Sequence, residues 1–244
     1  MENKQEKING GEIVVQNRFV KWLDNFWYHH KWTVIVISFF VLTFAVCFVQ
    51  CAKRENEDAM VSVAVGYTLS GKEQEAFIQV INAVAPKKIG TDAGLRVSLT
   101  TYSIYTEDVL RQMYTDPDGK LSTAAYNNAK QVSADHDKNY GTFLMTGECA
   151  VHFVSPYVYE SKNMSQLARP LSELYDAIPE SAYDGYAIRL ADTEFYQYYD
   201  AVKCLPADTL IVLTRPYVWG TSSDDTAYQD FEALYRAIVE FKAP

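Results

Sequence analysis

Cysteine thiols are the first groups in this sequence that could do chemistry, and two of them lie close together. Cys47 and Cys51 are four residues apart, so a helix would place both on one face, where they could bind a metal, form a disulfide or carry a lipid. The neighbouring sequence supplies no further metal ligands, and Val46 and Gln50 replace the small residue that lipid attachment requires before a cysteine. We therefore expect both thiols to pack as small apolar groups.

The four histidines do not form a catalytic or metal-binding pattern. His29, His30, His136 and His152 include no pair at metal-ligand spacing with a carboxylate or a cysteine. His152 lies inside an apolar strand pattern, between Val151 and Phe153, which predicts a hydrogen-bonded core or half-buried imidazole. The sequence also has no P-loop, no G-x-S-x-G and no G-x-G-x-x-G. We therefore expect no catalytic residues, no metal, no cofactor and no enzymatic activity.

Two acidic segments resemble calcium-binding loops. In the first, DPDGK at 116–120, the glycine comes too early and no bidentate glutamate follows at the right distance. In the second, DHDKNYG at 135–141, Tyr140 and Thr146 take the places of the required glycine and glutamate. Calcium binding at the second segment remains an alternative, but a solvated helix surface fits it better.

Cys149 and Cys204 lie further along the chain. A disulfide between them is one interpretation, although the sequence does not place their Cα atoms within about 7 Å of each other. Burial as two small apolar side chains is the other interpretation. Both stay open from the sequence alone.

Charge is distributed unevenly over the 244 residues. The chain has a formal net charge of −9, and residues 55–244 hold 15 basic against 27 acidic side chains. An acidic domain argues against a nucleic-acid partner, because phosphate neutralisation needs a basic face. Solubility is the simplest reason for this charge.

One apolar stretch predicts a transmembrane helix over 32–52. Its 21 residues contain no Asp, Glu, Lys or Arg, and a helix of that length spans about 30 Å, the thickness of the hydrocarbon core of a bilayer. A cleaved signal peptide would have a shorter apolar region of roughly 7–15 residues, closed by small residues. An uncleaved anchor in the cell membrane therefore fits better.

Basic residues on both sides of this stretch predict its orientation. Arg18, Lys21 and Lys31 precede it, whereas Lys53 and Arg54 follow it. The excess of positive charge on the N-terminal side favours a cytoplasmic N-terminus. The acidic C-terminal domain should then lie outside the cytoplasm.

Residues 1–31 form the expected cytoplasmic segment. Phe19, Trp22, Leu23 and Phe26 recur at helical spacing, which indicates an amphipathic helix lying along the membrane surface. Plain continuation of the transmembrane helix is the alternative, and the sequence does not separate the two.

After a charged linker, 53–60, residues 61–244 alternate between strand and helix patterns. Such alternation implies helices on both faces of a parallel sheet, so we predict an α/β domain: a single three-layer lobe with a mostly parallel sheet of about five strands, preceded by one transmembrane helix. The expected strands are 61–68, 94–104, 149–155, 185–191 and 208–216, with helices near 70–86 and 106–114, from Ser122 onward, and at the C-terminus. The last helix should begin near Ser222 or Ser223 and bury Tyr228, Phe231, Leu234, Tyr235 and Ile238.

Residues 144–179 resemble part of the extracellular solute-binding proteins of ABC importers, which have the type 2 periplasmic-binding fold. In that family a helix ends in a glycine turn, and a strand, a short helix and spaced leucines follow. In this chain, Gly147 matches the turn, 150–154 the strand, and Leu167, Leu171 and Leu174 the leucines. Separately, the segment 24–32 is similar to the N-termini of small membrane-anchored proteins of Firmicutes.

The resemblance implies a lobe without the usual closing cleft. Members of the family have two lobes and hold the ligand between them, whereas residues 61–244 suffice for one. A ligand would therefore bind on an open face, or against a partner protein that supplies the second wall.

Open α/β sheets bind ligands beyond the carboxyl ends of their strands. Tyrosines and hydroxyl residues are predicted at three such ends, and they suit a small polar solute that stacks and accepts hydrogen bonds. With 18 tyrosines in the chain, chance placement is the alternative. The candidate ligand-binding residues are Tyr67, Thr68, Tyr102, Ser103, Ser155 and Tyr157.

The sequence therefore predicts a membrane-anchored, extracytoplasmic, non-enzymatic binding or accessory module. Its expected partners are the lipid bilayer, a membrane protein or transporter, and a small polar solute, but not nucleic acid. The alternative is a structural or protein-interaction ectodomain of a membrane complex without a small ligand. A concave, tyrosine-lined pocket at the strand ends would favour binding, whereas a filled rim would favour the alternative.

Overall fold

The computed structural model describes residues 18–53, 57–216 and 225–244. The chain divides into two units at the boundary between Asn56 and Glu57. The described residues of the first unit form helix α1, and the second unit contains the sheet and the remaining described helices.

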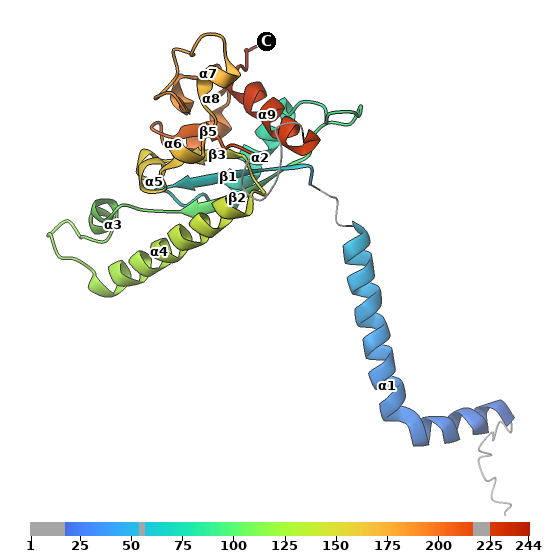
Figure 1. The fold of residues 1–244 in the computed structure, drawn as a ribbon. Helices are drawn as coiled ribbons and strands as arrows, with labels where there is room; N and C mark the ends of the chain where they lie inside the picture. Colours follow the sequence, from blue (N-terminus) through green and yellow to red (C-terminus); the bar gives the residue numbers. More distant parts are fainter. Residues whose placement is uncertain (1–17, 54–56, 217–224) are drawn as a thin grey trace, which may run out of the picture. The chain divides into compact units, whose positions relative to one another are not determined.

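Helix α1, Arg18–Lys53, contains the predicted span. Its segment Asn25–Val49 has a mean hydropathy of 2.6 and is long and apolar enough to cross a membrane. The hydroxyl of Thr43 donates to the carbonyl of Phe39 at 2.8 Å, so this polar group is bonded within the helix. The residues expected to form a separate amphipathic helix belong to the same helix, which is bent in its N-terminal half (Figure 1).

Five strands form one sheet in the second unit, in the order β2-β1-β3-β5-β4. Strand β1 begins two residues earlier than expected, which shortens the predicted linker. The five strands are β1 (Ala59–Val65), β2 (Val97–Ser103), β3 (Val151–Val154), β4 (Ala187–Arg189) and β5 (Leu210–Leu213).

The sheet is mixed rather than purely parallel. Strand β1 pairs in parallel with β2 and β3, whereas β5 runs antiparallel to both β3 and β4. Four strands therefore point one way and β5 points the other. The chain between β4 and β5 holds only short helices, α8 (Glu194–Tyr198), η1 (Leu190–Asp192) and η2 (Asp200–Cys204), so it turns back at one edge of the sheet without the long crossover that a parallel return needs.

Local sequence signals account for the beginnings of several helices. Ser70 and Glu73 form a capping box at the start of α2, and the hydroxyls of Thr106 and Ser155 cap α3 and α5. Besides α8, η1 and η2, the described helices of this unit are α2 (Gly71–Val84), α3 (Glu107–Met113), α4 (Thr123–Thr146), α5 (Pro156–Ser161), α6 (Met164–Leu167), α7 (Leu171–Leu174) and α9 (Thr226–Val239).

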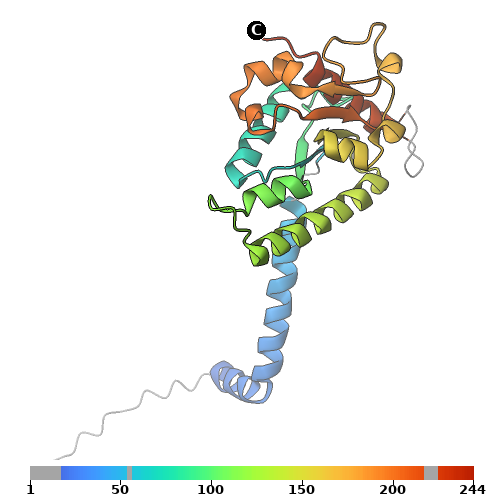
Figure 2. The ribbon, with the colours of Figure 1, turned by 90° about the vertical axis from the view of Figure 1, so that its left-hand side faces the viewer.

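Apolar side chains are buried on both faces of the sheet. On one face, Val63 and Phe153 belong to a cluster with residues of α2 and α9. On the other face, Ala64 and Val154 belong to a cluster with residues of α4 and α5, Tyr140 among them. Figures 1 and 2 show α4 along one face and α9 along the opposite one. The near-continuous burial of β1 and β3 follows from this coverage.

The C-terminal helix α9 confirms the predicted inward face. The five residues expected to be inside are all buried. Its N-terminal cap is Asp225, whose carboxylate accepts a hydrogen bond from the Ala227 amide at 2.9 Å. Ser222 and Ser223, the expected caps, lie outside the described residues.

Candidate functional site

The predicted carboxyl-end residues are brought to one edge of the sheet, where two of them bond to each other. The Thr68 hydroxyl donates to Ser103 Oγ at 2.8 Å and lies 2.7 Å from the hydroxyl of Tyr105. The neighbouring Tyr67 hydroxyl donates to the Glu73 carboxylate at 2.8 Å. Hydrogen bonds from Ser70 and from Tyr67 lower the pKa of Glu73.

The other three predicted residues have separate roles. Tyr102 packs against Tyr140 and Phe143, with ring centroids 5.1 and 5.7 Å away. Ser155 accepts a hydrogen bond from a backbone amide of α5, and Tyr157 is exposed on that helix. Four of the six predicted side chains, Tyr67, Thr68, Ser103 and Ser155, thus take part in hydrogen bonds within the domain.

Replacing Thr68 by valine should lower the free energy of unfolding by about 1 kcal/mol, because the buried Ser103 hydroxyl loses its partner. The change can be measured by urea unfolding of the full chain in a non-ionic detergent, followed by near-ultraviolet circular dichroism of the tyrosines. Replacement of the exposed Thr123 by valine serves as the control. Equal urea midpoints for the two variants would show that the hydrogen bonds of the Thr68 hydroxyl do not stabilise the domain.

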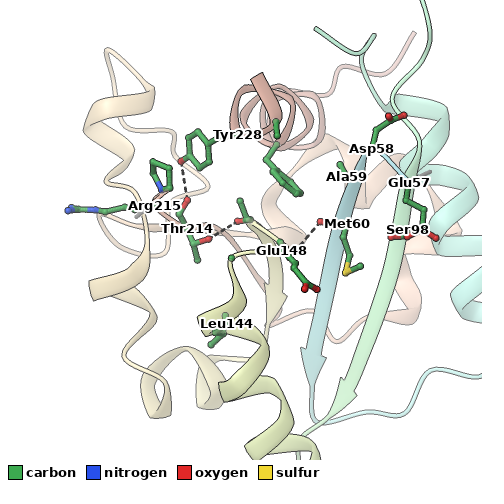
Figure 3. A pocket seen from close by; sticks show the side chains of 16 residues that line it. Glu57, Asp58, Ala59, Met60, Ser98, Leu144, Glu148, Thr214, Arg215 and Tyr228 are labelled. Carbon is green, nitrogen blue, oxygen red and sulfur yellow. Dashed lines mark hydrogen bonds between the residues drawn. The ribbon is translucent and has the colours of Figure 1, made fainter. Parts of the chain in front are cut away.

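A pocket of about 390 Å³ lies at the opposite end of the strands, where β1 and β3 begin (Figure 3). We call this end the amino edge of the sheet. None of the six predicted residues lines it. Its walls come from the start of β1, the end of α4, the residues before β3, the residues after β5 and the first two turns of α9. The lining residues are Glu57, Asp58, Ala59, Met60, Ser98, Leu144, Gly147, Glu148, Cys149, Ala150, Thr214, Arg215, Pro216, Ala227, Tyr228 and Phe231.

A left-handed glycine shapes one wall of the pocket. Gly147 ends α4 with φ at +69° and ψ at 12°, a backbone conformation that costs a side-chain-bearing residue more than it costs glycine. The chain therefore turns sharply after α4, and Glu148 and Cys149 follow before β3. The glycine singled out in the sequence thus positions two lining residues.

The reversed direction of β5 brings another wall to the same edge. The amide of Thr214 donates to the Ala150 carbonyl at 2.8 Å, and the Tyr228 hydroxyl donates to the Thr214 carbonyl at 3.0 Å. Arg215 Nε donates to the Ala168 carbonyl at 3.0 Å. These bonds tie β3, β5 and α9 together, so the wall is held in place without a ligand.

Cys149 contributes an inert thiol to the pocket lining. Its Sγ lies 3.1 Å from the Met60 carbonyl and 3.2 Å from that of Val151, and burial raises its pKa to about 12. A thiol this protonated at neutral pH is a poor nucleophile. Cys149 and Cys204 are both free, so the disulfide interpretation is wrong and burial is the correct one for Cys149.

A buried polar cluster lies next to the pocket lining. Ser62 Oγ is 2.6 Å from His152 Nδ1, with the Tyr140 hydroxyl 3.4 Å from the same nitrogen, and Thr214 Oγ1 is 3.5 Å from His152 Nε2. Burial lowers the pKa of His152 to about 4. Its imidazole is fully buried, in agreement with the core position expected for it.

The two segments that resemble calcium-binding loops use their acidic side chains in contacts within the domain. Residues 135–141 lie within α4, and Asp137 pairs with Lys162 at 2.8 Å. In the segment 116–120, Asp116 Oδ1 accepts from the Lys120 amide at 2.8 Å. Among the described residues, no group of three or more His, Cys, Asp or Glu side chains is arranged to hold a metal.

Comparison of the chain with protein-family models, curated proteins and solved structures found no match. The resemblance to solute-binding proteins therefore stays a prediction. The pocket is thus a concave site whose lining includes apolar side chains and a buried, protonated thiol.

Proposed function

We propose that this protein is a membrane-anchored, non-enzymatic binding module whose ligand occupies the pocket at the amino edge of the sheet. The observation that carries the proposal is the pocket of about 390 Å³. Ligand sites are concave, mostly apolar and largely formed before binding, with volumes of roughly 300–1,000 Å³. The bonds among Ala150, Thr214 and Tyr228 form such a wall in advance.

The proposal includes a cytoplasmic N-terminus and a domain outside the cytoplasm. It is supported by the N-terminal helix α1, the one helix in the described part of the chain that is long and apolar enough to cross a membrane, and by the excess of basic residues before this span. A domain in which four of five strands point the same way, with helices on both faces, is compatible with one three-layer solute-binding lobe. A membrane protein or transporter would then be the partner that receives the ligand.

The second candidate function is a protein-interaction ectodomain without a small ligand. The carboxyl ends of the strands favour it, because the hydroxyls of Thr68, Ser103 and Tyr67 are hydrogen-bonded to other side chains of the domain. We rank it second, because the amino edge of the sheet carries a pocket large enough for a small ligand.

Blocking the pocket provides the test. Ala227 lines the pocket from an exposed position in the first turn of α9, so Ala227→Trp should fill it without disturbing the core. A thermal-shift screen of small solutes on the full chain in non-ionic detergent should find ligands that raise the Tm. Saturation at about 100 times Kd corresponds to ~2.7 kcal/mol of stabilisation, and Ala227→Trp should abolish the shift.

The neighbouring Thr226 supplies a matched control, because it is exposed and does not line the pocket. Thr226→Trp should keep the ligand-induced shift. If the screen finds no solute that raises the Tm, and a membrane protein co-purifies with the chain, the second candidate function is favoured. Ligands that bind equally to both variants would contradict the pocket as their site.

A further inference from the structure

From the charge and the lining of this pocket, we infer that it selects an organic ammonium ligand, that is, a protonated amine carried on an apolar body. The inference rests on the proposed binding function and adds the chemical class of the ligand. It differs from the small polar solute expected at the strand ends, both in place and in chemistry.

Carboxylates stand at the mouth of the pocket. Glu57 and Glu148 both line it and are exposed, and Figure 3 shows Glu148 on the same side of the pocket as Leu144. Asp58 also lines the mouth, but its carboxylate is paired with Lys88. Two acidic side chains are therefore in position to meet a positive group.

The helix that carries this wall adds to the negative potential. Helix α4 has 24 residues and ends at the pocket, through Leu144 and Gly147. The C-terminal end of a helix carries a partial negative charge that favours nearby cations. At the other wall, α9 begins with its positive end, but the Asp225 carboxylate caps it and accepts from the Ala227 amide.

Positive side chains do little to offset these charges. Among the described lining residues Arg215 is the one cation. Its Nε donates to the Ala168 carbonyl, and Figure 3 shows its side chain directed away from the other lining residues. An anionic ligand would therefore meet carboxylates without a facing cation, whereas a cationic ligand is also drawn in by the acidic domain as a whole.

Aromatic and apolar side chains form the interior. Tyr228 and Phe231 project from α9, and Met60 and Leu144 lie on other walls. Aromatic rings attract ammonium groups through their π faces, by about 0.5–2 kcal/mol depending on desolvation. The same surface packs against the carbon body of the ligand.

One hydroxyl in the lining is unused by the described part of the chain. Ser98 Oγ is buried and has no hydrogen-bond partner among the described residues. Buried polar atoms in native proteins are normally paired. This oxygen is fully covered by its neighbours, so a bound molecule would reach it only after a lining side chain moves, and it does not bear on the class of ligand.

Three matched probes test the inference on the full chain in non-ionic detergent: 4-phenylbutylamine, 4-phenylbutanol and 4-phenylbutanoate. They share one apolar body and differ in charge at pH 7.5. Isothermal titration calorimetry, with protein-free micelles as the blank, should give the order amine, alcohol, carboxylate. We expect about a tenfold preference for the amine over the carboxylate, since rim carboxylates attract one and repel the other.

Variants assign the preference to the pocket. Glu148→Gln should weaken amine binding about threefold and leave alcohol binding unchanged. Glu160→Gln, at an exposed position on α5, is the matched control and should change neither. Ala227→Trp should remove binding of both probes.

The outcomes separate the inference from the function beneath it. Equal binding of amine and alcohol, lost in Ala227→Trp, would overturn the ammonium inference and leave the pocket as a ligand site. Absence of binding for all three probes would contradict both. The same chemistry could come from a free amine or from a lysine side chain of a partner. Displacement of the amine by an N-acetylated peptide with one lysine among apolar residues would support the inference and assign the lysine source, whereas no displacement would assign the free amine.

Discussion

Replacing Phe153 by alanine is expected to lower the free energy of unfolding of the domain by about 3–5 kcal/mol. Phe153 lies in β3, in the middle of the sheet, and is fully buried. Its ring meets Phe77 of α2 edge-to-face, with centroids 5.3 Å apart and planes at 86°, and such a pair adds about 0.5–1.5 kcal/mol beyond burial. Since whole domains are stable by roughly 5–15 kcal/mol, this single change removes a large share.

Urea unfolding of the full chain in non-ionic detergent would measure the loss, with near-ultraviolet circular dichroism reporting on the domain. Met113→Ala is the control, because Met113 is 55% exposed and its truncation should cost less than about 0.5 kcal/mol. A loss below about 1 kcal/mol for Phe153→Ala would contradict the packing of α2 on this face of the sheet.

Most of the strands and helices could be predicted from the apolar pattern and the capping residues of the sequence. Strands β1, β3 and β5 are short apolar runs, and the capping signal at Ser70 lies at the observed start of α2. The α/β class, five strands and the buried face of α9 follow from such local signals.

The direction of β5 could not be predicted in the same way. A fully buried strand has the same apolar sequence whether it runs parallel or antiparallel. What sets the direction is the path of residues 190–209, whose short helices return the chain at one edge. The register of β5 on β3, with Val151 opposite Leu213, is a non-local pairing that a single sequence does not specify.

The position of the pocket could not be predicted from the sequence for the same reason. The rule that places ligands beyond the carboxyl ends of the strands assumes a largely parallel sheet. Here the antiparallel β5 brings Thr214 and Arg215 to the amino edge, where they line the same pocket as Glu148 and Met60. Gly147 was a visible signal for the turn, but nothing local indicated that Tyr228 and Phe231 would cover it.

The polar cluster next to the pocket lining links stability to pH. His152 shares the buried side of the sheet with Ser62, Tyr140 and Thr214. None of these partners is charged at neutral pH, and a backbone hydrogen bond at Cys149 offsets the effect of burial on the imidazole only in part. Cys149 lies nearby with its thiol protonated as well. The cluster is therefore built around a neutral histidine.

Lowering the pH from 6.5 to 4 is expected to destabilise the domain by about 3 kcal/mol through His152 alone. Burial lowers the pKa of His152 from 6.5 to about 4 in the folded state. Between these values the unfolded chain binds one more proton than the folded chain, so stability falls as pH falls, by up to ~1.4 kcal/mol per pH unit. Above about pH 6.5 both states hold a neutral imidazole and the contribution disappears. Urea unfolding at pH 7.5, 6.0 and 5.0 would measure the slope.

Two variants in the same cluster decide whether His152 is the source. His152→Gln removes the titrating group, so its stability should depend less on pH between 6.5 and 5, whatever its baseline at neutral pH. Ser62→Ala removes the hydroxyl 2.6 Å from the imidazole but keeps the buried histidine. It should lower the free energy of unfolding by about 1 kcal/mol at every pH and retain the slope.

Carboxylates whose pKa is lowered in the folded state, such as Glu107 at about 2, lose their contribution to stability mainly below their unfolded pKa of about 4.3. A slope between pH 6.5 and 5 that persists in His152→Gln would therefore assign the acid sensitivity to other groups.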